Sequence, residues 1–175
     1  MAARCITLLI GAVLIVGNIL GCASTPANDR SVCDGLTAPA SYQIFLFLSK
    51  EYNPPEQIVQ ALENNTTYAL LQLNQDVKIV KDLKTVGNDG ILLRIDIIGS
   101  RRGGVSKRID IRYQIINNAS KEVMVKENDA VNSKLGYEKI TIKLGRKIAN
   151  KVNGLISCMQ GRGKQSTNVT EKPVN

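Results

Sequence analysis

Five short segments of the chain carry the residue patterns of β-strands: 42–48, 77–80, 91–98, 109–115 and 121–126. The first is an almost continuous apolar run, which is typical of a well-buried strand. The third and fourth alternate apolar and polar residues, which is typical of strands with one exposed face. Turns rich in Gly and Asn separate the last three segments, with residues 99–104 interpreted as a glycine-rich hairpin loop. These three segments therefore predict an antiparallel meander.

Two further segments carry helical patterns. Pro55 followed by Glu56 predicts the start of a helix, but the Asn-Asn-Thr-Thr stretch at 64–67 is poor in helix formers. One helix, or two with a cap at Thr66 or Thr67, both fit this pattern. The last helix is defined by apolar residues at spacings of three and four, with Ser133 as a candidate cap. Its stripe consists of Tyr137, Ile140, Leu144, Ile148, Val152, Leu155 and Met159.

The order β-α-β-β-β-β-α predicts one α/β (α+β) domain over residues 42–160. We expect one mostly antiparallel sheet of four to five strands with two helices packed on one face. Residues 22–41 are rich in small and polar residues and predict a flexible tether, and residues 161–175 predict a disordered tail.

The N-terminus has the pattern of a targeting segment. A single basic residue, Arg4, precedes an uncharged, mainly apolar run at 6–16, as in a signal peptide over residues 1–21. A transmembrane helix is the alternative, but the 18 residues from Cys5 to Cys22 are at the lower limit for spanning a bilayer and contain Asn18.

Residues 19–22, Ile-Leu-Gly-Cys, resemble the lipobox of bacterial lipoproteins. The resemblance implies cleavage after Gly21 and covalent lipid on Cys22. A cleaved secretory signal with an accidental cysteine is the alternative. In lipoproteins an Asp after the cysteine marks the inner membrane, so Ala23 favours the periplasmic face of the outer membrane. Several acyl chains hold a protein on a membrane stably, whereas one does not.

The predicted domain resembles small periplasmic lipoprotein domains, including the N-terminal part of the curli secretion lipoprotein CsgG and the lipopolysaccharide-assembly lipoprotein LptE. The resemblance rests on pattern and order: the strand at 44–48, the helix from Pro55, the strands at 77–80, 90–95 and 109–115, and the closing helix. The loop at 101–104 is too short and too charged to resemble a pore-forming hairpin. The resemblance therefore implies an accessory role and no channel.

Besides the lipidated Cys22, two cysteines remain in the mature chain, Cys33 and Cys158. In an oxidising compartment an even pair predicts a structural disulfide. It would close a loop of 158 − 33 = 125 residues, worth about 5 kcal/mol in the chain-entropy model. Metal binding is the alternative, but two thiolates without His make a poor zinc site.

The composition argues against catalysis, because the chain has no His and no Trp. No imidazole can serve a Ser-His or Cys-His nucleophile or ligate a metal. The glycine-rich stretch at 99–104 lacks the Lys-Ser/Thr ending of a phosphate-binding loop and joins two strands. Asp96 and Asp110 are expected on the solvent face, in cross-strand ion pairs with Arg94 and Arg112. We therefore expect no enzyme activity, no metal and no cofactor besides the lipid on Cys22.

The positive charge is uneven along the chain. The mature chain carries 22 − 15 = +7, made up of 6 − 9 = −3 over residues 23–100, 13 − 5 = +8 over 101–151 and 3 − 1 = +2 in the tail. Such a surface attracts anionic lipid, lipopolysaccharide or an acidic protein, and a solvated helix face is the alternative. Nucleic acid is disfavoured because stacking aromatics are lacking. The candidate surface consists of Arg101, Arg102, Lys139, Lys143, Arg146 and Lys147.

Together these features predict a membrane-anchored periplasmic lipoprotein that acts as a non-catalytic adaptor of an envelope assembly, transport or secretion complex. The alternative is a binding module or carrier for an anionic lipid or lipopolysaccharide. A pocket lined by the apolar stripe of the last helix would favour the carrier.

Overall fold

The order of elements along the chain is the predicted one. The computed structural model describes residues 35–103 and 105–166. The elements are β1 (Ile44–Ser49), α1 (Glu56–Gln72), β2 (Val77–Ile79), the short 3-10 turn η2 (Leu83–Thr85), β3 (Ile91–Gly103), β4 (Ser106–Asn117), β5 (Val123–Ser133) and α2 (Tyr137–Ser166). This order confirms the predicted α/β class.

The strands form one five-stranded sheet in the order β2-β1-β3-β4-β5. The three longest strands, β3, β4 and β5, form the predicted antiparallel meander. β1 pairs in parallel with both of its neighbours, β2 and β3. The parallel pairing with β2 is possible because α1 carries the chain back along the sheet before β2 begins.

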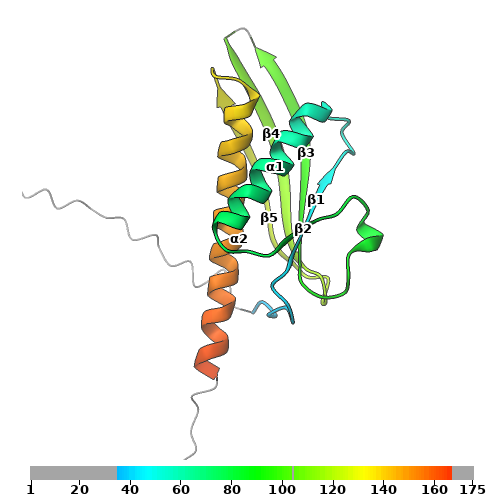
Figure 1. Ribbon diagram of the computed structural model, residues 1–175, viewed down its shortest axis with the longest axis vertical. Coiled ribbons are helices and arrows are strands. Elements are labelled where there is room, and N and C mark those ends of the chain that lie inside the picture. Colours follow the sequence, from blue (N-terminus) through cyan, green and yellow to red (C-terminus); the bar gives the residue numbers. More distant parts are fainter. Residues whose placement is uncertain (1–34, 104, 167–175) are drawn as a thin grey trace, which may run out of the picture.

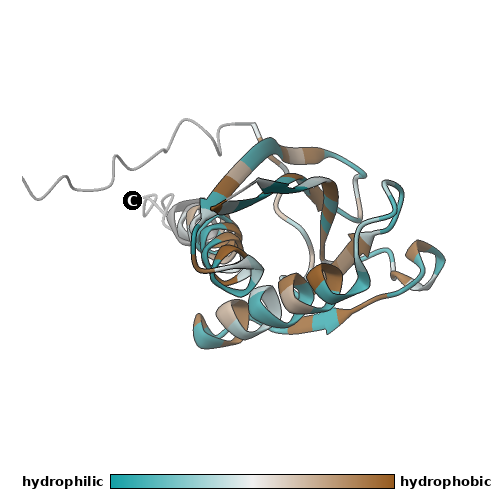
Figure 2. Ribbon diagram, turned by 90° about the horizontal axis from the view of Figure 1, so that it is seen from above, coloured by the Kyte–Doolittle hydropathy of each residue, from teal (hydrophilic) through white to brown (hydrophobic). Residues whose placement is uncertain are grey.

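Both helices cover one face of this sheet, and seen from above the strands bend around them (Figures 1 and 2). The main core lies between the two layers and takes alternate residues from the strands, among them Leu93, Ile95 and Ile97. From α2 it takes most of the predicted stripe. The buried residues of that stripe are Ile140, Leu144, Ile148, Val152, Leu155 and Met159. The predicted core face of the last helix is thereby confirmed.

A second, smaller apolar cluster lies on the other face of the sheet. Phe45, Val80 and Leu92 are buried there, with Val86 and Ile116 packed against them. Val80 and Val86 belong to the segment between β2 and β3, which covers this face near β1. Because β1 is covered on both faces, its sequence is a continuous apolar run instead of an alternating one.

α1 is one continuous helix through the Asn-Asn-Thr-Thr stretch, so the alternative of two helices capped at Thr66 or Thr67 is wrong. The stretch lies where α1 crosses α2. Thr66 is fully buried, and the Asn65 side-chain amide donates to Thr141 Oγ1 at 2.9 Å. A Cβ at Gly145 would lie 2.9 Å from the backbone of Thr66. Close helix packing outweighs the weak local helix propensity.

The prediction of a hairpin loop over 99–104 is also wrong, because it makes the loop too long. β3 continues to Gly103, which pairs with Ser106, so the turn itself is short. A β-bulge between Ile97 and Gly99 shifts the register and breaks the apolar alternation, which made the strand look shorter in sequence. β5 likewise extends to Ser133, whose Oγ accepts from the Leu135 amide and does not begin the helix.

α2 is longer than its apolar stripe and continues to Ser166, into residues assigned to the tail by sequence. At the other end, residues 35–41 contain no helix or strand, but Leu36 packs on the main core. The Thr37 carbonyl accepts from the Asn117 side chain at 2.9 Å. This contact places the start of the described chain at the end of the sheet opposite the β3–β4 turn (Figure 1).

Candidate partner-binding surfaces

The six basic residues of the candidate surface fall into two groups. Arg101 and Arg102 lie at the end of the β3–β4 hairpin and are exposed. The other four lie on α2 and are exposed as well: Lys139, Lys143, Arg146 and Lys147. The start of α2 lies beside the β3–β4 hairpin, because Lys107 Nζ of β4 lies 4.8 Å from the ring centroid of Tyr137. This cation–π contact was not predicted from the sequence.

Lys147 differs from its three neighbours on α2 because it is ion-paired. Its Nζ lies 2.7 Å from Asp129 Oδ2 of β5. One turn further along, Lys151 Nζ lies 2.9 Å from Glu127 Oε1. These two pairs fix the helix to the last strand of the sheet. By contrast, Lys139, Lys143 and Arg146 form no ion pair with any residue of 35–103 or 105–166, and we call these three the helix basic face.

A buried tyrosine completes the contact between the sheet and α2. Tyr113 is 1% exposed, and its hydroxyl donates to Glu127 Oε2. This bond and that from Lys151 hold the pKa of Glu127 below its ordinary value. Burial, followed by the bond to Glu127, raises the pKa of Tyr113 well above its ordinary value. The Tyr113 phenol therefore stays neutral, as a hydrogen-bond donor.

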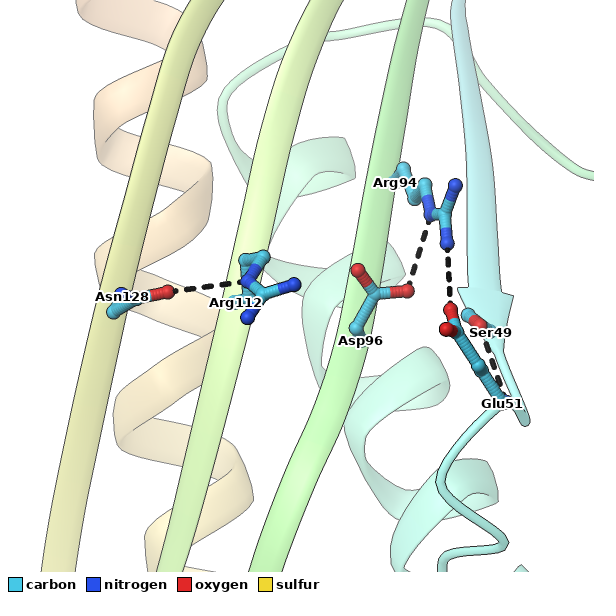
Figure 3. A network of polar contacts seen from close by, with 6 residues as sticks. All are labelled: Ser49, Glu51, Arg94, Asp96, Arg112 and Asn128. Atoms are coloured by element: carbon cyan, nitrogen blue, oxygen red, sulfur yellow. Dashed lines mark hydrogen bonds and ion pairs between the residues drawn. The ribbon is translucent and has the colours of Figure 1, made fainter.

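A network of charged side chains lies on the helix-free face of the sheet (Figure 3). Arg94 Nε lies 3.1 Å from Asp96 Oδ1, and its Nη2 lies 3.1 Å from Glu51 Oε2. Arg112 lies directly opposite Asp96 in the register but donates to Asn128. The predicted cross-strand pairs are wrong, because the ion pair runs along one strand. Asp96 is also 3% exposed, although a solvent position was predicted.

Asp110 also forms its ion pair along its own strand. Its Oδ1 lies 2.7 Å from Arg108, two residues back on the same strand. Across the strands it faces Gly99, at which an added Cβ would lie 3.2 Å from the Asp110 carboxylate. These carboxylates are held in structural ion pairs, and nothing brings Asp96 and Asp110 together as an acid–base pair. No group of three or more His, Cys, Asp or Glu in the described ranges could hold a metal ion.

The two edges of the sheet are poor templates for another strand. β2 has only three residues. β5 has eleven, but it carries a register shift near Val125 and charged side chains at 126, 127 and 129. The Ala130 amide donates to the Asp129 side chain at 2.8 Å and is therefore already satisfied. Bulges, charges and short length are the usual protections of sheet edges.

Three of the residues predicted from sequence concern the anchor and the disulfide. Cys22, the signal peptide and Cys33 lie outside the described residues, so lipidation and the Cys33–Cys158 disulfide stay predictions. Cys158 lies on α2, half-buried against the main core. None of the helices in the described ranges is long and apolar enough to cross a membrane.

No family model and no curated protein matches the sequence. Solved structures do match the fold. PelC from Paraburkholderia phytofirmans, solved as a dodecamer, is 15% identical; the match covers 71% of this chain and 94% of that one, with a TM-score of 0.51. A DUF330 protein from Xanthomonas campestris is 11% identical, covering 71% and 89%, with a TM-score of 0.50.

A lipoprotein from Neisseria meningitidis is 9% identical, covering 64% of this chain and 98% of that one, with a TM-score of 0.44. At such identities the likeness of PelC and the DUF330 protein shows a shared fold and nothing finer. The finer resemblance to CsgG and LptE stays a prediction.

Proposed function

We propose that this protein is a lipid-anchored, non-catalytic adaptor on the periplasmic face of the bacterial outer membrane. Its partner would be a complex for envelope assembly, transport or secretion. The lipobox ending at Cys22 supports the anchor, and Ala23 supports the outer membrane. Lipid attachment confines the domain to a surface and so raises its effective concentration for a membrane partner.

The helix basic face is the observation that carries this proposal. Lys139, Lys143 and Arg146 are exposed and unpaired with any described acidic residue, whereas Lys147 on the same helix is neutralised by Asp129. An acidic protein surface meeting this face would gain charge complementarity without losing any internal ion pair. The protected edges of the sheet support the same choice, since strand addition is disfavoured there.

The core weighs against the alternative of a lipid carrier. A carrier pocket was expected along the apolar stripe of the last helix, but Ile140, Leu144 and Ile148 on that stripe are fully buried against α1 and the sheet. A second copy of the chain is another candidate partner, because PelC was solved as a dodecamer. Size measurement of the purified complex separates self-association from a different protein.

The test is affinity capture of the lipidated protein from native membranes. We expect one stoichiometric protein partner, which is lost from the variant Lys139→Gln, Lys143→Gln, Arg146→Gln. The matched control is Lys78→Gln, Lys84→Gln, Lys126→Gln, which removes the same charge from exposed positions elsewhere and should retain the partner.

Co-purified lipid with no protein would contradict the adaptor and support the carrier. Equal loss of the partner from both triple variants would show that net charge matters and that the helix basic face does not.

A further inference from the structure

One end of the molecule gathers basic and exposed apolar side chains from two adjacent turns. The β3–β4 hairpin and the turn between β5 and α2 meet there (Figure 1). Lys107 pairs with Ser133 in the sheet, and its Nζ lies over the Tyr137 ring. We call this end the basic apex. It consists of Arg101, Arg102, Val105, Lys107, Lys134 and Leu135.

The basic side chains of the β3–β4 hairpin repel one another in the folded chain. Arg101 lies directly opposite Arg108, and Arg102 directly opposite Lys107. Like charges in direct cross-strand positions are destabilising. Asp110 neutralises Arg108 alone, and the other three cations form no ion pair with a described residue. An external anion at this end would relieve the repulsion.

Two apolar side chains project from the same end. Val105 is 81% exposed and Leu135 is 78% exposed, the highest values among the large apolar residues described. Isolated exposed apolar residues need no explanation. Here, however, the two most exposed ones come from separate turns and lie among the cations of the apex.

We infer that the basic apex is a second membrane contact, which places Val105 and Leu135 at the headgroup level of a bilayer rich in anionic lipid. Apolar side chains surrounded by Lys and Arg are the usual means by which a protein binds such a surface from one side. A soluble polyanion or an acidic protein loop would neutralise the cations and leave the apolar tips in water. This contact goes beyond the adaptor function, because it requires neither the partner nor the lipid on Cys22.

The length of the chain outside the described residues permits this contact on the anchoring membrane. The apex lies opposite residue 35, about 43 Å away along the 13 residues of β3. The 34 − 22 = 12 residues between Cys22 and residue 35 give 13 Cα-to-Cα steps, which span up to about 45 Å when extended. The domain can therefore lie along the bilayer with its apex in contact.

The chain has no Trp, so one introduced Trp is a unique fluorescent reporter. We would place it at the apex by Val105→Trp and, as a matched control, at an exposed apolar position elsewhere by Leu83→Trp. Each full-length protein is mixed or reconstituted with vesicles of phosphatidylcholine, with or without phosphatidylglycerol. We expect the emission of the Val105→Trp protein to shift to shorter wavelength and to be quenched by brominated lipid in the anionic vesicles only. The emission of the Leu83→Trp protein should do neither.

The basic side chains are tested in the Val105→Trp background. Arg101→Gln, Arg102→Gln, Lys107→Gln should lose most of the shift, while Lys78→Gln, Lys84→Gln, Lys126→Gln should retain it. Unshifted emission of the Val105→Trp protein on anionic vesicles would overturn the inference. An equal shift on neutral vesicles, or one produced by soluble polyphosphate without vesicles, would overturn it too. Failure of lipidation at Cys22 would leave this readout unchanged, so the two proposals fail separately.

Discussion

The crossing of the two helices depends on the absence of a side chain at Gly145. A Cβ at this position would lie 2.9 Å from Asn65 C, 2.9 Å from Thr66 N and 3.0 Å from Asn65 O. All three atoms belong to the backbone of α1, so no side chain can rotate away. Gly145→Ala therefore requires α1 and α2 to separate by roughly half an ångström at their closest point, because carbon contacts prefer about 3.5 Å.

The expected magnitude follows from two opposing terms. Overpacking by one carbon in a rigid contact costs about 1–3 kcal/mol. Replacing Gly by Ala inside a helix stabilises it by about 1 kcal/mol. Gly154→Ala isolates the second term, because Gly154 lies in the same helix and nothing would lie within 4 Å of its Cβ. We expect Gly145→Ala to be less stable than Gly154→Ala by about 1–3 kcal/mol.

Urea unfolding of the two variants and the natural chain, followed by circular dichroism, measures this difference. Gly154→Ala should raise the urea midpoint of unfolding. The midpoint of Gly145→Ala should lie below that of Gly154→Ala, with an unchanged m-value. If both substitutions stabilise the protein equally, the helices do not meet at Gly145, and close packing against α2 does not keep α1 continuous.

Three further predictions concern the polar contacts and the cysteines. Tyr113→Phe should lower the free energy of unfolding by about 1–2 kcal/mol. The hydrogen bond from Tyr113 lowers the pKa of Glu127 in the folded chain, so its contribution to stability is present above pH 4.5, the ordinary pKa, and is lost as the pH falls below it. If the free energy of unfolding fell equally with pH in the variant and the natural chain, this would be contradicted. Asp96→Asn should lower the free energy of unfolding in urea by about 1–3 kcal/mol, since Asp96 is buried beside Arg94. An unchanged midpoint would show that the ion pair does not stabilise the fold. Thiol titration of the unfolded, unreduced mature protein should find no free thiol from Cys33 and Cys158, whereas two would exclude the disulfide.

The sequence predicts this fold well wherever the signal is local. The alternation over 91–97 and 109–115 places the correct residues in the core, and the spacing of the last helix identifies its buried face. These patterns depend only on the period of a strand or a helix. The continuity of α1 could not be predicted, because the helix-poor stretch at 64–67 packs against Gly145, which lies about 80 residues further along the chain.

The grouping of residues at the candidate surfaces could not be predicted from the sequence, because it depends on the register of the strands. The bulge between Ile97 and Gly99 changes which side chains oppose each other in β3 and β4. That shift makes Arg101 face Arg108, and the β4–β5 register brings Lys107 to Ser133 beside the start of α2. The individual basic residues were recognisable in the sequence, but the apex depends on this pairing.

The most direct test of the central claim is the mass of the N-terminal peptide of the mature protein. After purification from membranes, trypsin should release the peptide from Cys22 to Arg30. We expect this peptide to begin at Cys22 and to carry the mass of a diacylglyceryl group and an acyl chain. An unmodified Cys22, or a chain that begins elsewhere, would contradict the lipid anchor on which the proposed adaptor function rests.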